Sequence, residues 1–312
     1  MQRVMWIAAL CGAVLLNGGT ARAEEGSEEA AGPNTGKIGF SAGFDVTTEY
    51  LFRGIFQEDQ GLILQPWFEA SVALFEFEGP ISSVDFVAGM WNSIHDGPTG
   101  SSAPGPGAWY EADVYAGFKF GLPANFSSEL TYTYLGAPDP PGSIYAEEFS
   151  FSLAYDDSEL WNFDLSERVR SQTGLPGFGG LQPYVTYVIE VDGASDGVGN
   201  GGDQYLEIGI GPQCTVLPSE TMPVTLTVPL VIGLSVDDYY ESPIDGDDEA
   251  FGFLQVGLDF SVPLWFVPAD YGSWSAHAGV NFFFLGDTVD DFNDGDDKHF
   301  EVIGVFGVSM EY

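Results

Sequence analysis

The sequence predicts an all-β protein, a transmembrane antiparallel up-and-down β-barrel of about 12 strands. Large apolar residues alternate with small, polar or acidic ones along most of the chain, a period that helices cannot produce. The alternating segments resemble tilted membrane strands in length, and short connections alternate with long ones. A soluble β-sandwich also alternates, but its strands have only about 5–6 residues, roughly half the length of these segments.

The N-terminus predicts a secretory signal peptide over residues 1–23. Arg3 supplies a basic start, Val4 to Leu16 is apolar, and Ala21-Arg22-Ala23 is a cleavage site of the A-x-A type. The apolar run is too short for a spanning helix, which needs about 20 residues. We therefore expect a processed chain that begins at Glu24.

The processed chain divides into a leader and a barrel. Residues 24–36 are polar and show no periodicity, which predicts a flexible leader. Residues 37–312 form the predicted outer-membrane β-barrel. The period-two pattern places strands at 37–47, 62–76, 82–93, 109–120, 126–135, 145–156, 182–191, 204–216, 223–236, 251–264, 274–285 and 299–312.

The clearest strand spans residues 223–236, where only Val231 interrupts the alternation. Short and long connections alternate between the predicted strands, as periplasmic turns and external loops do in bacterial barrels. One connection does not fit, because Asp157 to Leu181 is long yet falls on the turn side. It holds a short helix or a folded-in plug, or the strand count is wrong there.

The charge excludes one class of partner. The chain has 8 Lys and Arg against 47 Asp and Glu. Removing Arg3 and Arg22 leaves 6, so the formal charge of the processed chain is 6 − 47 = −41. Nucleic acid is excluded because its phosphates require clustered basic residues. Cys214 is the one cysteine after the signal peptide, so no intrachain disulfide or cysteine metal site is expected.

Acidic residues collect on the inward parity of the predicted strands, where large apolar residues are scarce. Rings of Asp and Glu attract cations in cation pores. We predict that the lumen is lined by Asp45, Glu69, Asp85, Glu111, Asp113, Glu129, Glu148, Glu190, Glu207, Asp259 and Glu301. Lys37, Lys119, His277 and His299 share this parity. The alternative is that these acids are solvated, or hydrogen-bonded across a closed lumen that does not conduct.

The segment from Thr48 to Gln57 reads T-E-Y-L-F-R-G-I-F-Q. It resembles the S-x-Y-x-F-R-G-x-S-Q signature of the Gcw_chp or TorF-type outer-membrane porin family, with Thr48 and Phe56 in place of the two serines. The resemblance implies a membrane barrel with a pore. Arg53 then either pairs with inward acids and narrows the lumen, or anchors the hairpin against Gly54. Looser similarity continues at residues 181–184 and 205–209.

Other chemistry is not expected. The acid-rich external loops 237–249 and 286–298 could hold Ca²⁺ or Mg²⁺, but Phe292 breaks the EF-hand pattern, and we predict no metal and no cofactor. The G-x-S-x-G and H-E-x-x-H motifs are absent, so the chain is not predicted to be an enzyme.

The predicted function is a porin-like channel in the bacterial outer membrane for passive diffusion of small, preferably cationic, solutes. The alternative is a non-conducting structural or adhesive surface barrel whose acidic loops contact cations. The expected partners are outer-membrane lipid, the solutes, and the outer-membrane assembly machinery. The terminal aromatic Tyr312 on an alternating strand resembles the signal that this machinery selects.

Overall fold

The computed structural model describes residues 36–96, 108–138, 143–161, 178–199, 201–219, 222–293 and 299–312. The predicted signal peptide and all but the last residue of the predicted leader lie outside the described residues, and both stay predictions. No helix among the described residues is long and apolar enough to span a membrane.

The described chain is a closed antiparallel barrel of 12 strands, two of which are interrupted. The strands of its wall are β1 (Ile38–Thr47), β4 (Ile63–Glu76), β5 (Ser83–His95), β6 (Trp109–Gly121), β7 (Phe126–Ala137), β8 (Ser143–Tyr155), β9 (Tyr184–Gly193), β10 (Gln204–Ile210), β11 (Gln213–Leu217), β12 (Val224–Thr227), β13 (Leu230–Asp237), β14 (Phe251–Pro263), β15 (Ser273–Leu285) and β16 (Phe300–Glu311). The predicted fold class and strand number are confirmed.

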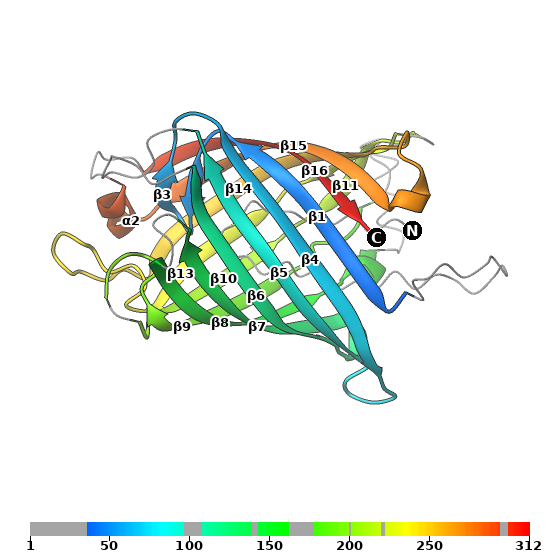
Figure 1. Ribbon diagram of the computed structural model, residues 1–312, viewed down its shortest axis with the longest axis horizontal. Coiled ribbons are helices and arrows are strands. Elements are labelled where there is room, and N and C mark those ends of the chain that lie inside the picture. Colours follow the sequence, from blue (N-terminus) through cyan, green and yellow to red (C-terminus); the bar gives the residue numbers. More distant parts are fainter. Residues whose placement is uncertain are drawn as a thin grey trace.

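When β10 with β11 and β12 with β13 are each counted as one interrupted strand, each strand of the wall pairs with the next one along the chain, and the ring closes between the first and the last (Figure 1). The closing seam joins β1 to β16, with Phe44 opposite Val308. Two backbone hydrogen bonds extend the seam to the end of the chain. Phe40 N donates to Tyr312 O (3.0 Å) and Tyr312 N donates to Phe40 O (2.8 Å). Pairing β1 with β16 leaves neither strand with a free edge at this seam, as a membrane barrel requires.

Two predicted strands are each interrupted by a proline. The segment predicted at 204–216 is split into β10 and β11 at Pro212, and the segment at 223–236 into β12 and β13 at Pro229. Proline has no N–H group to donate to a neighbouring strand. Backbone bonds still join the interrupted strands, since Val228 N donates to Pro212 O (3.0 Å) and Gly257 N donates to Pro229 O (2.8 Å). The wall is therefore continuous across both breaks.

The two faces of the wall differ as the alternation predicts. Large apolar side chains such as Phe44, Phe118, Phe151 and Phe306 are exposed on the outside. Buried polar and acidic side chains lie on the inside. Val231, which interrupts the alternation, is 1 % exposed and packs inside with an apolar cluster. A closed barrel with an apolar outer surface and a polar interior is the architecture of outer-membrane proteins, and this is an outer-membrane β-barrel.

The long connections and the short turns lie at opposite ends of the barrel. In Figure 1, β3 (Ile55–Glu58) and α2 (Asp287–Phe292) lie at the end that carries the long loops, and the C-terminus lies toward the other. The short turns include η1 (Pro123–Asn125) and η3 (Ala269–Tyr271). By analogy with other barrels, the long loops are external.

The connection from Asp157 to Leu181 leaves the strand count intact. It begins with a short 3-10 helix, η2 (Ser158–Trp161). A short helix is one of the alternatives that the sequence left open for this connection. The buried Asp157 joins its two ends, because its carboxylate accepts hydrogen bonds from Trp161 Nε1 (2.6 Å) and Leu181 N (2.9 Å). Residues 162–177 lie outside the described residues, so a plug formed by this connection stays a prediction.

Candidate functional site

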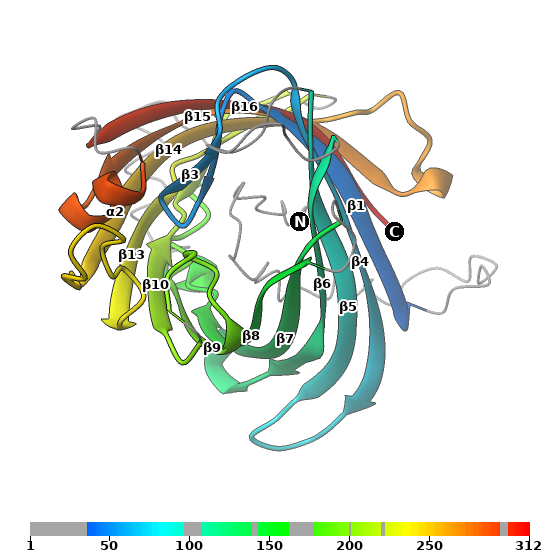
Figure 2. The same ribbon diagram turned by 60° about the vertical axis from the view of Figure 1, so that its left-hand side comes forward.

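The first external connection folds back into the barrel as a hairpin of β2 (Tyr50–Phe52) and β3. In Figure 2, β3 lies on the inner side of the strands near α2. Arg53 and Gly54 form the two-residue turn, with φ values of 48° and 89°. Two positive φ angles are typical of the type I′ turn that joins tight hairpins, and glycine adopts such angles without strain. The R-G pair of the sequence motif is therefore the tip of this hairpin.

Arg53 is 2 % exposed and fixes the hairpin tip to the wall. Its Nη1 and Nη2 atoms donate to the two carboxylate oxygens of Glu148 on β8, each at 2.7 Å. Nη1 also donates to the hydroxyl of Tyr239 (2.7 Å). The guanidinium lies over the rings of Phe52, Tyr205 and Tyr239, at 4.6–5.2 Å from their centroids. A planar guanidinium suits both a two-pronged carboxylate contact and stacking on aromatic rings.

The backbone of the hairpin tip is held by two further side chains. Tyr240 Oη donates to Arg53 O (2.9 Å). Asn293, which follows α2, makes a double contact: its Nδ2 donates to Gly54 O (3.0 Å) and its Oδ1 accepts from Phe56 N (2.7 Å). The three external connections that carry Arg53, Tyr240 and Asn293 are thereby joined inside the mouth of the barrel.

The base of the hairpin contacts the opposite part of the wall. Tyr50 Oη donates to Glu111 Oε2 on β6 (2.6 Å), and Tyr110 Oη donates to Gln57 Oε1 (2.6 Å). Buried tyrosine hydroxyls usually find such a partner. The hairpin is consequently bonded to strands on several sides of the barrel.

Apolar packing follows the alternation of the hairpin. Leu51 belongs to one buried cluster and its neighbours Tyr50 and Phe52 belong to another. The first cluster also contains residues of β9, β10, β13, β14, β15, β16 and α2, including Phe253 and Val289. The second contains residues of β4, β7 and β8. The hairpin therefore lies between two parts of the wall and fills the space between them.

A small cavity remains beside the hairpin. It has a volume of about 20 Å³ and is lined by hairpin residues and by β1, β4, β15 and β16, including Gln65 and Asn281. A cavity of this size holds about one water molecule.

The 11 predicted acidic lining residues all lie on the inward parity of the wall. The buried ones are Asp45, Glu111, Asp113, Glu129, Glu148, Glu190 and Glu207. The half-buried ones are Glu69, Asp85, Asp259 and Glu301. Their register agrees with this placement, as Glu301 lies opposite the buried Phe283 and Asp45 opposite the buried Gln65.

Two of the four predicted inward basic side chains contact these acids. Lys119 Nζ lies 2.7 Å from Glu69 Oε1 and 3.7 Å from Glu129 Oε2. His277 Nε2 lies 2.9 Å from Asp45 Oδ1. Lys37 and His299, in contrast, are exposed just outside the ends of β1 and β16. Both keep the parity of the inward residues, because the carbonyl oxygens of Lys37 and His299 accept hydrogen bonds from Ala73 N (2.8 Å) and Leu285 N (2.9 Å), but they lie beyond the strand ends and contact none of these acids.

The acidic external loops are mostly solvent-exposed where they are described. Asp237, Asp245 and Asp247 are exposed, and residues 294–298 lie outside the described residues. In the described parts of these two loops, no three side chains that could bind a metal lie close together. The clustered carboxylates lie instead at the end of β9 and on its connection to β10. The sequence analysis selected one of the three, Glu190, and only as a residue that lines the lumen.

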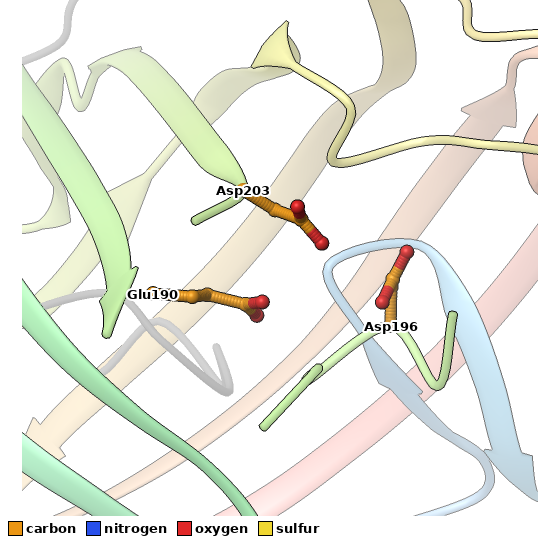
Figure 3. Close-up of side chains that lie close together, drawn as sticks. All are labelled: Glu190, Asp196 and Asp203. Carbon is orange, nitrogen blue, oxygen red and sulfur yellow. The ribbon is translucent and has the colours of Figure 1, made fainter. Parts of the chain in front are cut away.

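That cluster consists of Glu190, Asp196 and Asp203, whose carboxylates point toward one another (Figure 3). One oxygen from each lies within 4.8 Å of the others. Burial raises the pKa of Asp196 to about 8, and the charges of Glu190 and Asp203 contribute to the increase. Burial also raises the pKa of Asp203, together with the loop acids Asp238 and Glu241. The glycine- and aspartate-rich segment 192–203 was the available sequence signal.

Comparison with known families agrees with the motif at the hairpin. Residues 28–157 match the Gcw_chp family. The Gcw_chp model is described as a bacterial protein of unknown function. The matched range contains the whole Thr48–Gln57 segment, so the resemblance is confirmed there. The Gcw_chp match ends before residues 181–184 and 205–209, and its description names no pore. No curated protein matches the chain.

Several solved structures are similar to the chain over most of its length. An outer membrane channel from Pseudomonas putida F1 is 9 % identical with a TM-score of 0.41, covering 88 % of this chain and 94 % of that one. The NanC porin is 8 % identical (TM-score 0.39; 88 % and 98 % covered). The β domain of the Bordetella autotransporter BrkA is 8 % identical (TM-score 0.40; 88 % and 98 % covered). The names of these three proteins describe different activities, so the comparison does not indicate which activity this chain has.

Proposed function

We propose that this protein is a bacterial outer-membrane channel for passive diffusion of small, preferably cationic, solutes, with the β2–β3 hairpin as its constriction. The observation that carries the proposal is the charge of the inner wall. Eleven acids lie on the inward face against two permanently charged inward cations, Arg53 and Lys119, among the described residues. The formal charge of this group is 2 − 11 = −9 with all acids ionised.

The charge acts through the low-dielectric wall that surrounds it. Coulomb interactions are stronger where side chains displace water, and clefts lined with one sign of charge concentrate ions of the other sign. Lys119 and Arg53 contact Glu69, Glu129 and Glu148. The other acids have no Lys or Arg ion pair among the described residues, so they supply the field that favours cations.

Reversal potentials in planar bilayers test the selectivity. With a KCl gradient across a bilayer that contains the wild-type chain, we expect the sign for cation preference. Asp259→Asn removes one inward charge from β14 and should reduce that preference. Asp270→Asn removes the same charge from the exposed turn helix η3 and is the matched control. A reversal potential with the sign for anion preference would contradict the proposal.

One observation favours a second function, a structural surface barrel that does not conduct. The hairpin tip is buried, and the cavity beside it holds about one water molecule. On this hypothesis the wild-type chain gives no current in planar bilayers and no swelling of liposomes in small sugars. Loop deletions would then alter the integrity of the envelope or its adhesion. Stable current steps from the wild-type chain would exclude it.

A further inference from the structure

The connection between β9 and β10 doubles back on itself, which brings distant acids together. Glycines with positive φ at positions 193, 197, 199, 201 and 202 permit this path. Asp196 near its start meets Asp203 at its end, and both meet Glu190, which points inward from β9. Glu190 is 1 % exposed, Asp196 6 % and Asp203 9 %, so three carboxylates are gathered away from solvent.

Two oxygens of this cluster are buried without a hydrogen-bond partner, Glu190 Oε2 and Asp196 Oδ2. The companion oxygens do have donors: Glu190 Oε1 accepts from Ser195 N (2.8 Å) and Asp196 Oδ1 from Val198 N (3.0 Å). In the described part of the chain, no Lys, Arg or His forms an ion pair with any of the three carboxylates. Burying unpaired acidic oxygens is costly unless a proton or a cation satisfies them.

The spacing suits a cation bound by all three side chains. Two oxygens that bind one Ca²⁺ at about 2.3–2.6 Å lie at most about 5 Å apart. The three carboxylate oxygens lie within 4.8 Å of one another, which is inside that limit. Ca²⁺ accepts carboxylates in irregular arrangements, whereas Mg²⁺ requires near-octahedral geometry at shorter distances. Zinc sites contain Cys or His even where Asp or Glu is also a ligand, and the cluster has neither Cys nor His.

We propose that Glu190, Asp196 and Asp203 bind one Ca²⁺ ion at the external mouth of the barrel. Carboxylates of the cluster supply the charge, and water or loop carbonyls complete the coordination. The neighbouring external loop adds to the attraction, because Asp237, Asp238, Glu241 and Asp248 all act electrostatically on Asp203. The cluster shares Glu190 with the acidic lining of the proposed channel, whereas Asp196 and Asp203 are not part of that lining. Calcium binding is measured without any current, so the failure of one proposal can be told from the failure of the other.

The cation site would also be linked to the hairpin. Ser195 donates to Glu190 through its backbone N and its hydroxyl. The same hydroxyl lies 2.9 Å from Tyr239 Oη, which accepts from Arg53. A bound Ca²⁺ therefore fixes the loop that supports the hairpin tip, and we expect it to raise the thermal midpoint of the folded barrel.

Calorimetric titration of the folded chain with CaCl₂ in detergent tests the proposal. We expect one Ca²⁺ per wild-type chain, with a Kd of about 0.1–1 mM as in extracellular calcium modules. Asp196→Asn and Glu190→Gln keep the side-chain shapes and should weaken binding at least about tenfold, since ligand charge sets affinity. Asp192→Asn removes an equal charge from the exposed end of β9, close to the cluster but not part of it. This variant should bind Ca²⁺ as the wild type does.

The wild-type titration decides the outcome even if a variant does not fold, which heat-modifiable migration on gels would reveal. Absence of saturable binding by the folded wild-type chain up to about 10 mM Ca²⁺, well above that Kd range, would overturn the proposal. Equal affinity of folded Asp196→Asn and Asp192→Asn would overturn it as well. If the Asp192→Asn variant and the Asp196→Asn variant each lost binding, the proposal would also be contradicted, because the general negative charge of the loop would then explain the binding.

Discussion

Arg53 and Glu148 form a two-pronged ion pair inside the barrel, with both N–O distances at 2.7 Å and both side chains almost fully buried. The pair joins the tip of the first external connection to β8, 95 positions along the chain. Its position explains why an arginine stands at a positive φ in a turn. The guanidinium can reach the wall from the hairpin tip and is the charge that balances Glu148.

Replacing Arg53 by methionine should destabilise the folded barrel. The change leaves the carboxylate of Glu148 buried without its partner, and breaking a buried pair in this way costs about 3–5 kcal/mol. We expect the free energy of unfolding in phospholipid vesicles, measured with urea and tryptophan fluorescence, to fall by up to about that amount.

The control for this change is Arg53→Lys, which keeps the charge but loses the two-pronged geometry. It should be less destabilising than Arg53→Met. A second control, Arg53→Met combined with Glu148→Gln, removes the unpaired charge and should recover part of the loss. If Arg53→Met unfolds at the same urea concentration as the wild type, the ion pair does not hold the hairpin.

Gly54→Ala tests the conformation of the hairpin tip. Gly54 has φ 89°, and an added Cβ would lie 3.3 Å from Phe253 Cδ1. A side chain in the left-handed region costs about 1–2 kcal/mol, so the variant should lose stability of that order in the same assay. Gly79→Ala, where an added Cβ meets nothing within 4 Å, should change stability by less than about 0.5 kcal/mol. Equal effects of the two substitutions would contradict the hairpin geometry.

Phe306→Lys tests the orientation of the wall. Phe306 lies at the centre of β16 and is 54 % exposed on the outer face. A lysine facing lipid at the midplane of the bilayer costs about 2–4 kcal/mol. We expect that loss in the free energy of unfolding in vesicles, whereas Phe306→Leu, which stays apolar, should lose much less. If the lysine variant were as stable as the leucine variant, Phe306 would not face lipid.

The strands could be predicted from the sequence because lipid and the interior impose opposite chemistry on alternate residues. The sequence thus places β14 at 251–264, and the structure has Phe251–Pro263. The breaks at Pro212 and Pro229 were also readable, since proline removes a backbone donor. They were missed because the alternation continues through both prolines.

The fold of the first connection was harder to predict. Its apolar residues Tyr50, Leu51 and Phe52 are unusual in a loop that faces water, and that pattern indicates burial. Nothing local shows which strand Arg53 meets, because Glu148 is 95 residues away. The carboxylate cluster depends on the path of a glycine-rich loop, which tertiary contacts determine. For this reason Glu190 was assigned to the wall alone, and Asp196 and Asp203 were not selected.

The central claim is that the β2–β3 hairpin occupies the mouth of an acid-lined barrel, and single-channel conductance tests it most directly. The measurement compares the wild-type chain with a chain whose residues 50–58 are replaced by a Gly/Ser segment of equal length. We predict larger current steps for the replaced chain, with the preference for cations retained. Equal conductance in the two folded chains, or loss of cation preference on removing the hairpin, would contradict the account.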